Sequence, residues 1–315
     1  MLKSPQIRTI WLDAPHCLSQ DSALTLGSFD GIHLGHKKLL ERLIISASQK
    51  SLSPMLLTFD PHPRLVLSHD ILVLTTVAER EILLRQSGLT CIVHMRFTKE
   101  FAEMSAGEFV EKYLVESLDV KHLVVGYDHH FGKGRAGKPG GMLKLGEKFG
   151  FTVDIVPPVE TGGIVVKSNL IRDFISSGRI DKANELLGHP YLVFGEVMPG
   201  RGIGTHIGFA TANLEIPSFK QLPMDGVYAA TASILPDASE KDAMVYVGRA
   251  PTFDLPKKMF EVHIFDHDGS QLYGKHIAVW IHKFIRSDIT FKSTDELRQQ
   301  IANDAKEVQR VLSDI

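Results

Sequence analysis

The pattern of apolar residues changes near residue 188, and this change constrains the fold more than any other feature of the chain. Before it, apolar stretches suited to strands alternate with stretches whose apolar residues recur at helical spacing. After it, short β-rich stretches follow one another without helices, separated by turns rich in Gly, Pro and Asp. The chain has 315 residues, more than one hydrophobic core usually organises. We therefore predict two domains, residues 1–187 and residues 188–315.

The first domain is predicted to be an α/β domain built on a parallel sheet. An apolar strand over residues 23–27 is followed by a glycine-containing turn and by a helix over residues 37–50. Strands and helices continue to alternate, which is typical of βαβ units and predicts a Rossmann-like fold. The other strands are expected over residues 55–59, 122–126 and 151–156, and the other helices over residues 109–118, 172–177 and 180–187.

The second domain is predicted to be antiparallel and to end in a helix. Its close strand spacing suits an antiparallel barrel or a sandwich, and the predicted fold is an antiparallel β-barrel. The strands are expected over residues 193–197, 226–234, 243–247, 260–265 and 276–284. The last segment starts with a capping box formed by Ser293 and Glu296, and we expect its helix to pack on the strands. Its apolar residues form one stripe: Leu297, Ile301, Ala305, Val308 and Leu312.

Charge and cysteine content limit the partners that this chain can have. The formal net charge is −2, so no overall positive field exists to hold a nucleic-acid backbone or an anionic membrane. No apolar run approaches the roughly 18 residues that span a bilayer. Cys17 and Cys91 are the only thiols, which suits a reducing cytoplasm. We expect a cytoplasmic protein with small-molecule substrates and neither nucleic-acid nor membrane partners; its oligomeric state is left open.

The turn after the first strand has the composition of a phosphate-binding site. Residues 27–36 read GSFDGIHLGH, and three glycines let this backbone approach a ligand closely. The helix that begins beside them offers unpaired N–H groups to an anion. His33 and His36 face the same side of the first helical turn, where each can donate a hydrogen bond to phosphate oxygens. A polyphosphate is therefore the expected ligand.

Three further segments of the first domain have distinctive sequences. They are TFDPHP at residues 58–63, FTKEFAEMSAGEFV at residues 97–110 and GYDHHFGKGRAG at residues 126–137. Together with the turn, they resemble the prokaryotic bifunctional riboflavin kinase/FAD synthetase family, and the likeness extends over essentially the entire chain. It implies a nucleotidyltransferase domain in which the FMN phosphate attacks the α-phosphorus of ATP and pyrophosphate leaves. Positioning and charge stabilisation by the turn, two histidines and Mg²⁺ would then carry the reaction.

The resemblance assigns roles to residues of the first domain, with His33 and His36 as the catalytic pair. ATP or phosphate binding is implied for Gly27, Phe29, Asp30, Gly31, Gly35, Ser168 and Arg172. Contacts to the flavin or the nucleotide are implied for Asp60, His62, Asp128 and Arg135. Residues 167–172 read KSNLIR where the family usually has Ser-Ser-Thr-x-Ile-Arg. His129 and His130 stand where an aromatic residue and an arginine are common.

A glycine-rich segment of the second domain, residues 200–213, reads GRGIGTHIGFATAN. Thr211 and Asn213 place two neutral oxygen ligands on the same side of an extended chain, a partial shell for Mg²⁺ that leaves room for water and ATP. The segment resembles the riboflavin kinase loop that ends in Gly-Phe-Pro-Thr-Ala-Asn, with Ala210 in place of proline and Thr205 in place of an arginine. The resemblance implies phosphate binding by three glycines of this loop: Gly202, Gly204 and Gly208.

One strand of the second domain carries a glutamate on its polar side. Residues 260–265 read FEVHIF, and alternation places the apolar residues on one face and Glu261 and His263 on the other. In the family, the glutamate of this segment takes the proton from the riboflavin 5′-hydroxyl, as hydroxyl-to-phosphate transfer requires. The resemblance therefore makes Glu261 the expected catalytic base.

The sequence predicts a bifunctional enzyme that converts riboflavin to FMN and FMN to FAD, with ATP as co-substrate and Mg²⁺ as cofactor. Two other interpretations stay open. In the first, the chain has kinase activity alone, because residues 167–172 diverge from the family's phosphate-binding stretch. In the second, the chain is a catalytically inactive flavin-binding protein with the same folds. The second is disfavoured by five retained residues: His33, His36, Thr211, Asn213 and Glu261.

Overall fold

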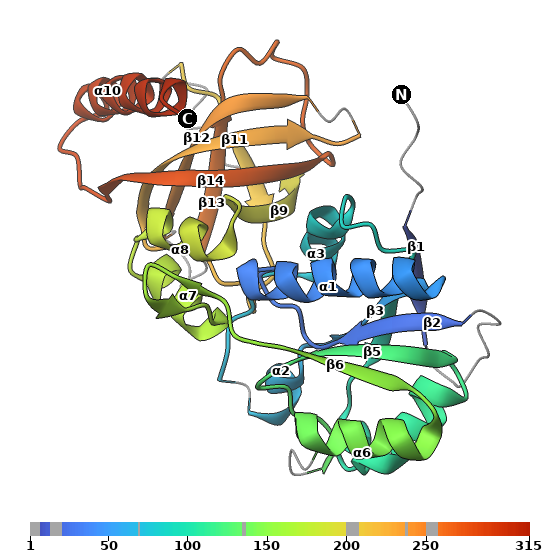
Figure 1. The fold of residues 1–315 in the computed structure, drawn as a ribbon. Helices are drawn as coiled ribbons and strands as arrows, with labels where there is room; N and C mark the ends of the chain where they lie inside the picture. The colour runs from blue at the N-terminus through green and yellow to red at the C-terminus, as the bar shows by residue number, and fades with distance from the viewer. Residues whose placement is uncertain are drawn as a thin grey trace. The chain divides into compact units, whose positions relative to one another are not determined.

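The computed structural model describes residues 7–12, 21–68, 70–133, 137–199, 208–236, 239–249 and 258–315. They form two compact units, shown in Figure 1. The first unit consists of Met1–Val73 and Arg80–Lys167, and the second of Leu74–Glu79 and Ser168–Ile315. Some residues named in the sequence analysis lie outside the described residues: Cys17, Arg135, Gly202, Gly204 and Thr205.

The first unit contains a six-stranded parallel sheet with strand order β1-β4-β3-β2-β5-β6. Its strands are β1 (Arg8–Trp11), β2 (Ser22–Leu26), β3 (Ser53–Asp60), β4 (Cys91–Arg96), β5 (Val120–Gly126) and β6 (Thr152–Val156). The predicted parallel α/β fold is confirmed, and the sequence analysis had not assigned β1 and β4. From β2 the chain continues to β3 and β4 on one side, whereas β5 and β6 lie on the other, so the strand order reverses between β2 and β5.

The four central strands β2, β3, β4 and β5 are mostly buried on both faces of the sheet, which is why they read as nearly continuous apolar runs. Neighbouring residues of a strand point to opposite faces. Ala23 of β2 therefore belongs to a core that includes residues of helix α1 (Leu34–Lys50), and Leu24 belongs to a second core that includes Met142 of helix α6 (Pro139–Phe149). The two helices cover opposite faces of the sheet (Figure 1).

The remaining elements of the first unit are short. They are α2 (Pro63–Leu67), α4 (Lys99–Ala102), α5 (Ala106–Phe109), η1 (Val110–Val115), β7 (Glu160–Thr161) and β8 (Ile164–Val165). The helix predicted over residues 109–118 starts earlier, because Ser105 and Glu108 form a capping box before Ala106, and it continues as the π-helical segment η1. Helix α3 (Val77–Leu84) begins in the second unit and ends in the first.

The second unit is a closed barrel with strand order β10-β13-β12-β11-β14-β9, in which all neighbours are antiparallel. Its strands are β9 (Tyr191–Met198), β10 (Ala212–Glu215), β11 (Gly226–Ile234), β12 (Glu240–Arg249), β13 (Lys258–Ile264) and β14 (His276–Ser287). Helices α7 (Ser168–Ser176), α8 (Ile180–Leu187) and α10 (Thr294–Ser313) complete the unit. The predicted antiparallel β-barrel with a helix at its end is confirmed.

The C-terminal helix α10 packs on the barrel as predicted. Val308 and Val311 form a core cluster with apolar residues of β11 and β12. At its start, the Ser293 hydroxyl accepts a hydrogen bond from the Glu296 backbone N–H. The Glu296 carboxylate accepts from the Lys292 N–H instead of that of Ser293, so the predicted capping box is only half formed.

Candidate active sites

The GSFDGIHLGH turn lies where an open parallel sheet usually binds its ligand. Such sheets bind ligands beyond the carboxyl ends of their strands, at the point where the strand order reverses. In the first unit this point lies between β2, which the turn follows, and β5, which ends at Gly126. The fold thus brings two of the motifs singled out in the sequence to one edge of the sheet.

The backbone of this turn is held in an unusual conformation. Phe29 and Ile32 have φ angles of 48° and 44°, in the left-handed region that side chains disfavour. Both are almost fully buried, with 1% and 2% of their surface exposed, so packing holds the strained conformation. Gly31 between them has a φ of 89°, where a glycine meets no steric cost. Strained residues held by packing are typical of ligand-binding turns.

His33 and His36 lie against each other at the start of α1. Their ring centroids are 3.7 Å apart, with 15° between the planes. The His33 Nδ1 caps the helix by accepting a hydrogen bond from the His36 backbone N–H at 3.3 Å. The proton of a neutral His33 ring is therefore on Nε2. A Cβ atom at position 35 would lie 3.1 Å from the His33 ring, which is closer than such atoms normally approach. The missing side chain of Gly35 therefore leaves room for the ring.

His36 is partly buried and lies between two aromatic rings, with its Nδ1 atom inaccessible to solvent. It stacks on Phe29 with 4.6 Å between centroids, as well as on His33. Burial, assisted by the neighbouring His33, lowers the pKa of His36 well below its ordinary value. Within the described part of the chain, its Nδ1 has no hydrogen-bond partner. At neutral pH, His36 is thus an uncharged ring whose buried nitrogen can exchange hydrogen bonds with a ligand.

This burial predicts an acid-dependent loss of stability. The unfolded chain protonates His36 near its ordinary pKa of 6.5, whereas the folded chain does so only at lower pH. Stability is therefore full above that pH and falls as the pH decreases below it. We expect the thermal unfolding midpoint to fall between pH 7.5 and 5, and to fall less in His36→Asn. An equal fall in both proteins would contradict the assigned pKa.

The end of β3 carries two predicted site residues, Asp60 and His62. Burial raises the pKa of Asp60, although Arg80 and Arg96 oppose this change. The His62 Nδ1 accepts a hydrogen bond from the Arg64 N–H at 3.1 Å and so caps α2. Arg80 donates to the backbone carbonyl of Phe59 at 3.3 Å. The structure thus adds two arginines to this end of the sheet that the sequence analysis had not singled out.

The end of β5 carries Asp128, which is exposed, and two histidines. His129 stacks on Phe131 with 5.8 Å between ring centroids. Burial lowers the pKa of His129 to about 4, so this ring is uncharged at neutral pH. The His130 Nδ1–H donates to the backbone carbonyl of Asp128 at 2.6 Å.

Ser168 and Arg172 are the two predicted phosphate ligands that the structure assigns to the second unit. Both belong to helix α7, where Arg172 donates a hydrogen bond to the side-chain oxygen of Asn169 at 2.7 Å. The sequence analysis had placed them in the adenylylating domain. The first unit ends at Lys167, because the following helix α7 packs mainly with α8.

A pocket of about 510 Å³ opens at the carboxyl ends of β1 and β4. Phe101 and Tyr113 in its wall belong to a cluster of aromatic rings with centroids 6.0 Å apart or closer. Residues 97–110 form one of the distinctive segments of the first domain, but none of them was predicted to be a site residue. The high aromatic content of that segment was the feature of the sequence that could have indicated the pocket. The pocket is lined by Leu12, Met95, Arg96, Thr98, Glu100, Phe101, Met104 and Tyr113.

In the barrel, strand register places Asn213 directly opposite Glu261. Asn213 of β10 pairs with Glu261 of β13, so the two side chains share one face of the sheet. The predicted alternation of β13 is confirmed: Phe260 and Val262 are buried, whereas Glu261 and His263 are half-buried on the other face. The two residues singled out in separate segments of the sequence are neighbours in the fold.

The end of the glycine-rich loop is fixed close to this pair. The His263 Nδ1–H donates to the backbone carbonyl of Ala210 at 2.8 Å, directly before Thr211. Gly208 is exposed and has a φ of 86°. Thr211 and Asn213 flank the buried Ala212, which is consistent with their expected common side. His263 is a contact that the sequence analysis did not foresee.

Comparisons with known proteins identify both halves of the chain. Family models match residues 17–170 as FAD synthetase and residues 187–312 as riboflavin kinase. The bifunctional riboflavin kinase/FMN adenylyltransferase of Escherichia coli (strain K12) is 35% identical over 296 residues, covering 92% of this chain and 93% of that protein. The protein of the same name from Bacillus subtilis (strain 168) is 32% identical over 320 residues, covering 98% and 99%. The chain belongs to the bifunctional riboflavin kinase/FMN adenylyltransferase family.

Membership confirms the predicted family and both activities. The enzyme phosphorylates riboflavin to FMN and adenylylates FMN to FAD, with ATP as co-substrate. Because both domains match over most of their length, the alternatives of a kinase alone and of an inactive flavin-binding protein are not supported. Sequence divergence in residues 167–172 does not remove the chain from the family.

A solved structure has the same fold over nearly the whole chain. It is described as a macrolide-efflux protein from Streptococcus pneumoniae, and it aligns with a TM-score of 0.85 and 32% identity over 96% of this chain and 99% of its own. That description applies to the other protein. No helix within the described ranges of this chain is long and apolar enough to cross a bilayer.

Tyr246 lies directly opposite Glu261, on the neighbouring strand β12. Burial raises the pKa of Tyr246 to about 12, with further contributions from Asp288, Glu261 and Asp225. The phenol therefore stays protonated beside Glu261 throughout the physiological range. Nothing in the sequence alone marked this residue.

The donor set around Asn213 suits magnesium. Thr211 and Asn213 offer neutral oxygens, and Mg²⁺ prefers oxygen ligands while keeping several waters. The portion of the chain that the structure describes contains no cluster of three or more His, Cys, Asp or Glu residues that would suit a tightly held metal.

Proposed function

We propose that each activity belongs to one end of the chain, with residues 1–187 adenylylating FMN and residues 188–315 phosphorylating riboflavin. The family matches over residues 17–170 and 187–312 support this division. The observation that carries the kinase assignment is the pairing of Asn213 with Glu261 on neighbouring strands. We also infer that the enzyme works in the cytoplasm, where its thiols stay reduced.

For the kinase, we infer that Glu261 is the base. Its carboxylate takes the proton of the riboflavin 5′-hydroxyl, the hydroxyl oxygen bonds to the γ-phosphorus of ATP, and ADP leaves. Thr211 and Asn213 would hold Mg²⁺, which neutralises charge on the ATP phosphates when bound. The hydrogen bond from His263 to the Ala210 carbonyl supports this role, because it fixes the backbone next to Thr211.

For the adenylyltransferase, we infer that the GSFDGIHLGH turn receives the phosphates of ATP. An FMN phosphate oxygen bonds to the α-phosphorus and pyrophosphate leaves, so no covalent enzyme intermediate is needed. The start of α1 and the backbone of Gly27, Gly31 and Gly35 suit an anion. The rings of His33 and His36 would donate hydrogen bonds as charge builds on the transferred group.

We further propose that the pocket beside β4 receives the flavin of FMN. Its volume lies within the usual range for small-molecule sites, and its wall is mainly apolar with a few polar groups. Phe101 and Tyr113 offer aromatic surface to a planar ring, and Arg96 offers a cation.

A substitution at Phe101 tests this placement. Phe101→Ala is expected to raise the KM for FMN in FAD formation by about tenfold, because stacking and apolar burial of this order would be lost. Phosphorylation of riboflavin should be unchanged. Phe149→Ala is the matched control, since Phe149 packs against the same core but does not line the pocket. An unchanged KM for FMN in a folded Phe101→Ala protein would exclude this pocket as the flavin site.

A further inference from the structure

Two charged side chains that the proposed mechanism does not use are completely buried in the barrel unit. Glu79 and Lys220 form an ion pair with 2.9 Å between the carboxylate and the ammonium, and both side chains have 0% exposure. Glu79 reaches this unit from the segment Leu74–Glu79, which lies between β3 and β4 in the sequence. Charges persist in such a place only when their hydrogen-bonding groups are satisfied.

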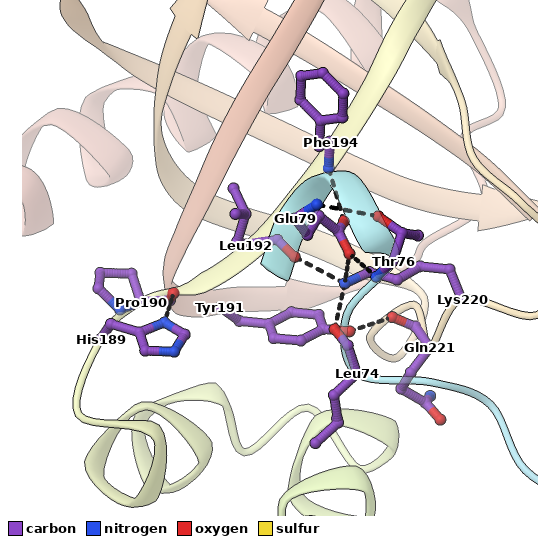
Figure 2. A network of polar contacts seen from close by, with 10 residues as sticks. All are labelled: Leu74, Thr76, Glu79, His189, Pro190, Tyr191, Leu192, Phe194, Lys220 and Gln221. Carbon is purple, nitrogen blue, oxygen red and sulfur yellow. Dashed lines mark hydrogen bonds and ion pairs between the residues drawn. The ribbon is translucent and has the colours of Figure 1, made fainter. Parts of the chain in front are cut away.

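The surroundings satisfy both groups (Figure 2). The Lys220 ammonium donates to the Glu79 carboxylate and to the backbone carbonyls of Leu74 and Leu192, so each of its three N–H bonds has an acceptor. The Glu79 carboxylate also accepts from the backbone N–H groups of Thr76 at 2.7 Å and Phe194 at 2.9 Å.

Two of these partners belong to one edge of strand β9. The other edge of β9 pairs with β14 from Tyr191 onward, but on this edge β10 pairs only with residues 196–198. Before residue 196, the Leu192 carbonyl bonds to Lys220 and the Phe194 N–H bonds to Glu79. The ion pair supplies one donor and one acceptor to β9, as a neighbouring strand would. It therefore closes the barrel where the short strand β10 ends.

The same pair fixes the chain that leaves β10. Lys220 lies five residues beyond Glu215, the last residue of β10, and its side chain is anchored to β9. Strand β10 is only four residues long and carries Asn213, which pairs with Met198 of β9 and Glu261 of β13. A strand this short has few ladder bonds of its own, so its position depends on what holds its ends.

We propose that Glu79 and Lys220 are positioning residues for riboflavin phosphorylation, which close the seam between β9 and β10 and so hold Asn213 opposite Glu261. This proposal rests on the proposed kinase site. The segment Leu74–Glu79 would then contribute to the kinase activity through Glu79, although in sequence it lies within the adenylylating half. Neither side chain contacts a reacting atom; both act through β10.

The test measures how riboflavin phosphorylation by the full-length enzyme depends on Mg²⁺. Lys220→Met, Glu79→Gln and the double variant are compared with Lys182→Met, which removes a lysine from an exposed ion pair on α8. We expect the first three to raise the half-saturating Mg²⁺ concentration at least fivefold, and Lys182→Met to leave it unchanged. FAD formation from FMN in the same samples should stay within twofold of wild type.

The double variant separates positioning from mere stability. It leaves no unpaired buried charge, so it is expected to unfold at a temperature closer to that of wild type than either single variant does. A wild-type Mg²⁺ dependence in the folded double variant would overturn the proposal. Asn213→Ala is measured alongside: if it leaves the Mg²⁺ dependence unchanged, the proposed metal ligand is wrong. If Asn213→Ala raises the value and the Glu79 and Lys220 variants do not, only the positioning role fails.

Discussion

Replacing Glu261 with glutamine is expected to slow riboflavin phosphorylation by about two to four orders of magnitude. The amide keeps the shape and hydrogen-bonding reach of the carboxylate but accepts no proton, so the 5′-hydroxyl would lose its base. The rate of ADP release with saturating riboflavin and ATP measures this change. ATP binding should change little, because the metal would be held by Thr211 and Asn213.

Glu196→Gln is the matched control for this experiment. Glu196 is an exposed glutamate on β9 of the same barrel, so the chemical change is identical while the proposed site is left intact. FAD formation from FMN should be unaffected in both variants. A Glu261→Gln enzyme that retains phosphorylation within a few-fold of wild type would show that Glu261 is a solvated strand residue and that the kinase site lies elsewhere.

The second large effect is expected at His36. His36→Ala should lower the rate of FAD formation from FMN by about two to three orders of magnitude, the usual loss when one donor to a developing charge is removed. Phosphorylation of riboflavin should continue at the wild-type rate. Pyrophosphate release from FMN and ATP, and ADP release from riboflavin and ATP, are measured on the same preparation.

His36→Ala also removes packing contacts, because the His36 ring stacks on both Phe29 and His33. Two further substitutions separate this loss of packing from the loss of the hydrogen-bond donor. His36→Gln retains an N–H donor and is expected to recover part of the lost rate, whereas His36→Leu restores apolar volume without a donor and should not. Full activity of a folded His36→Leu enzyme would mean that the ring only supports the strained turn.

Local sequence patterns predicted much of the fold because they depend on neighbouring residues alone. Period-two alternation placed Glu261 on the polar face of β13, and the apolar runs of β2 and β3, followed by helical patterns, indicated strands of a parallel sheet. The glycine turn between β2 and α1 was recognisable in the same way. These predictions hold in the structure because the apolar faces that the patterns define are the faces that become buried in the core.

Elements whose stability comes from distant contacts were missed. Helix α6 contains Gly140, Gly141 and Gly146, which are weak helix formers, so its sequence did not indicate a helix. In the fold, a Cβ at Gly146 would come within 2.5 Å of the Phe151 carbonyl oxygen, so only glycine permits the close packing that holds this helix. Strand β4 includes His94, a polar residue that is fully buried.

The sequence by itself determined the family, the two reactions, the parallel sheet, the turn after β2 and the polar face of β13, because these follow from motifs and local periodicity. Only the tertiary structure decided which of those residues meet. Strand register set Asn213 beside Glu261, and burial left His36 uncharged. A segment preceding β4 supplied the carboxylate for Lys220. Pairing and burial join residues far apart in the chain, and no local pattern records which distant group will satisfy a buried charge.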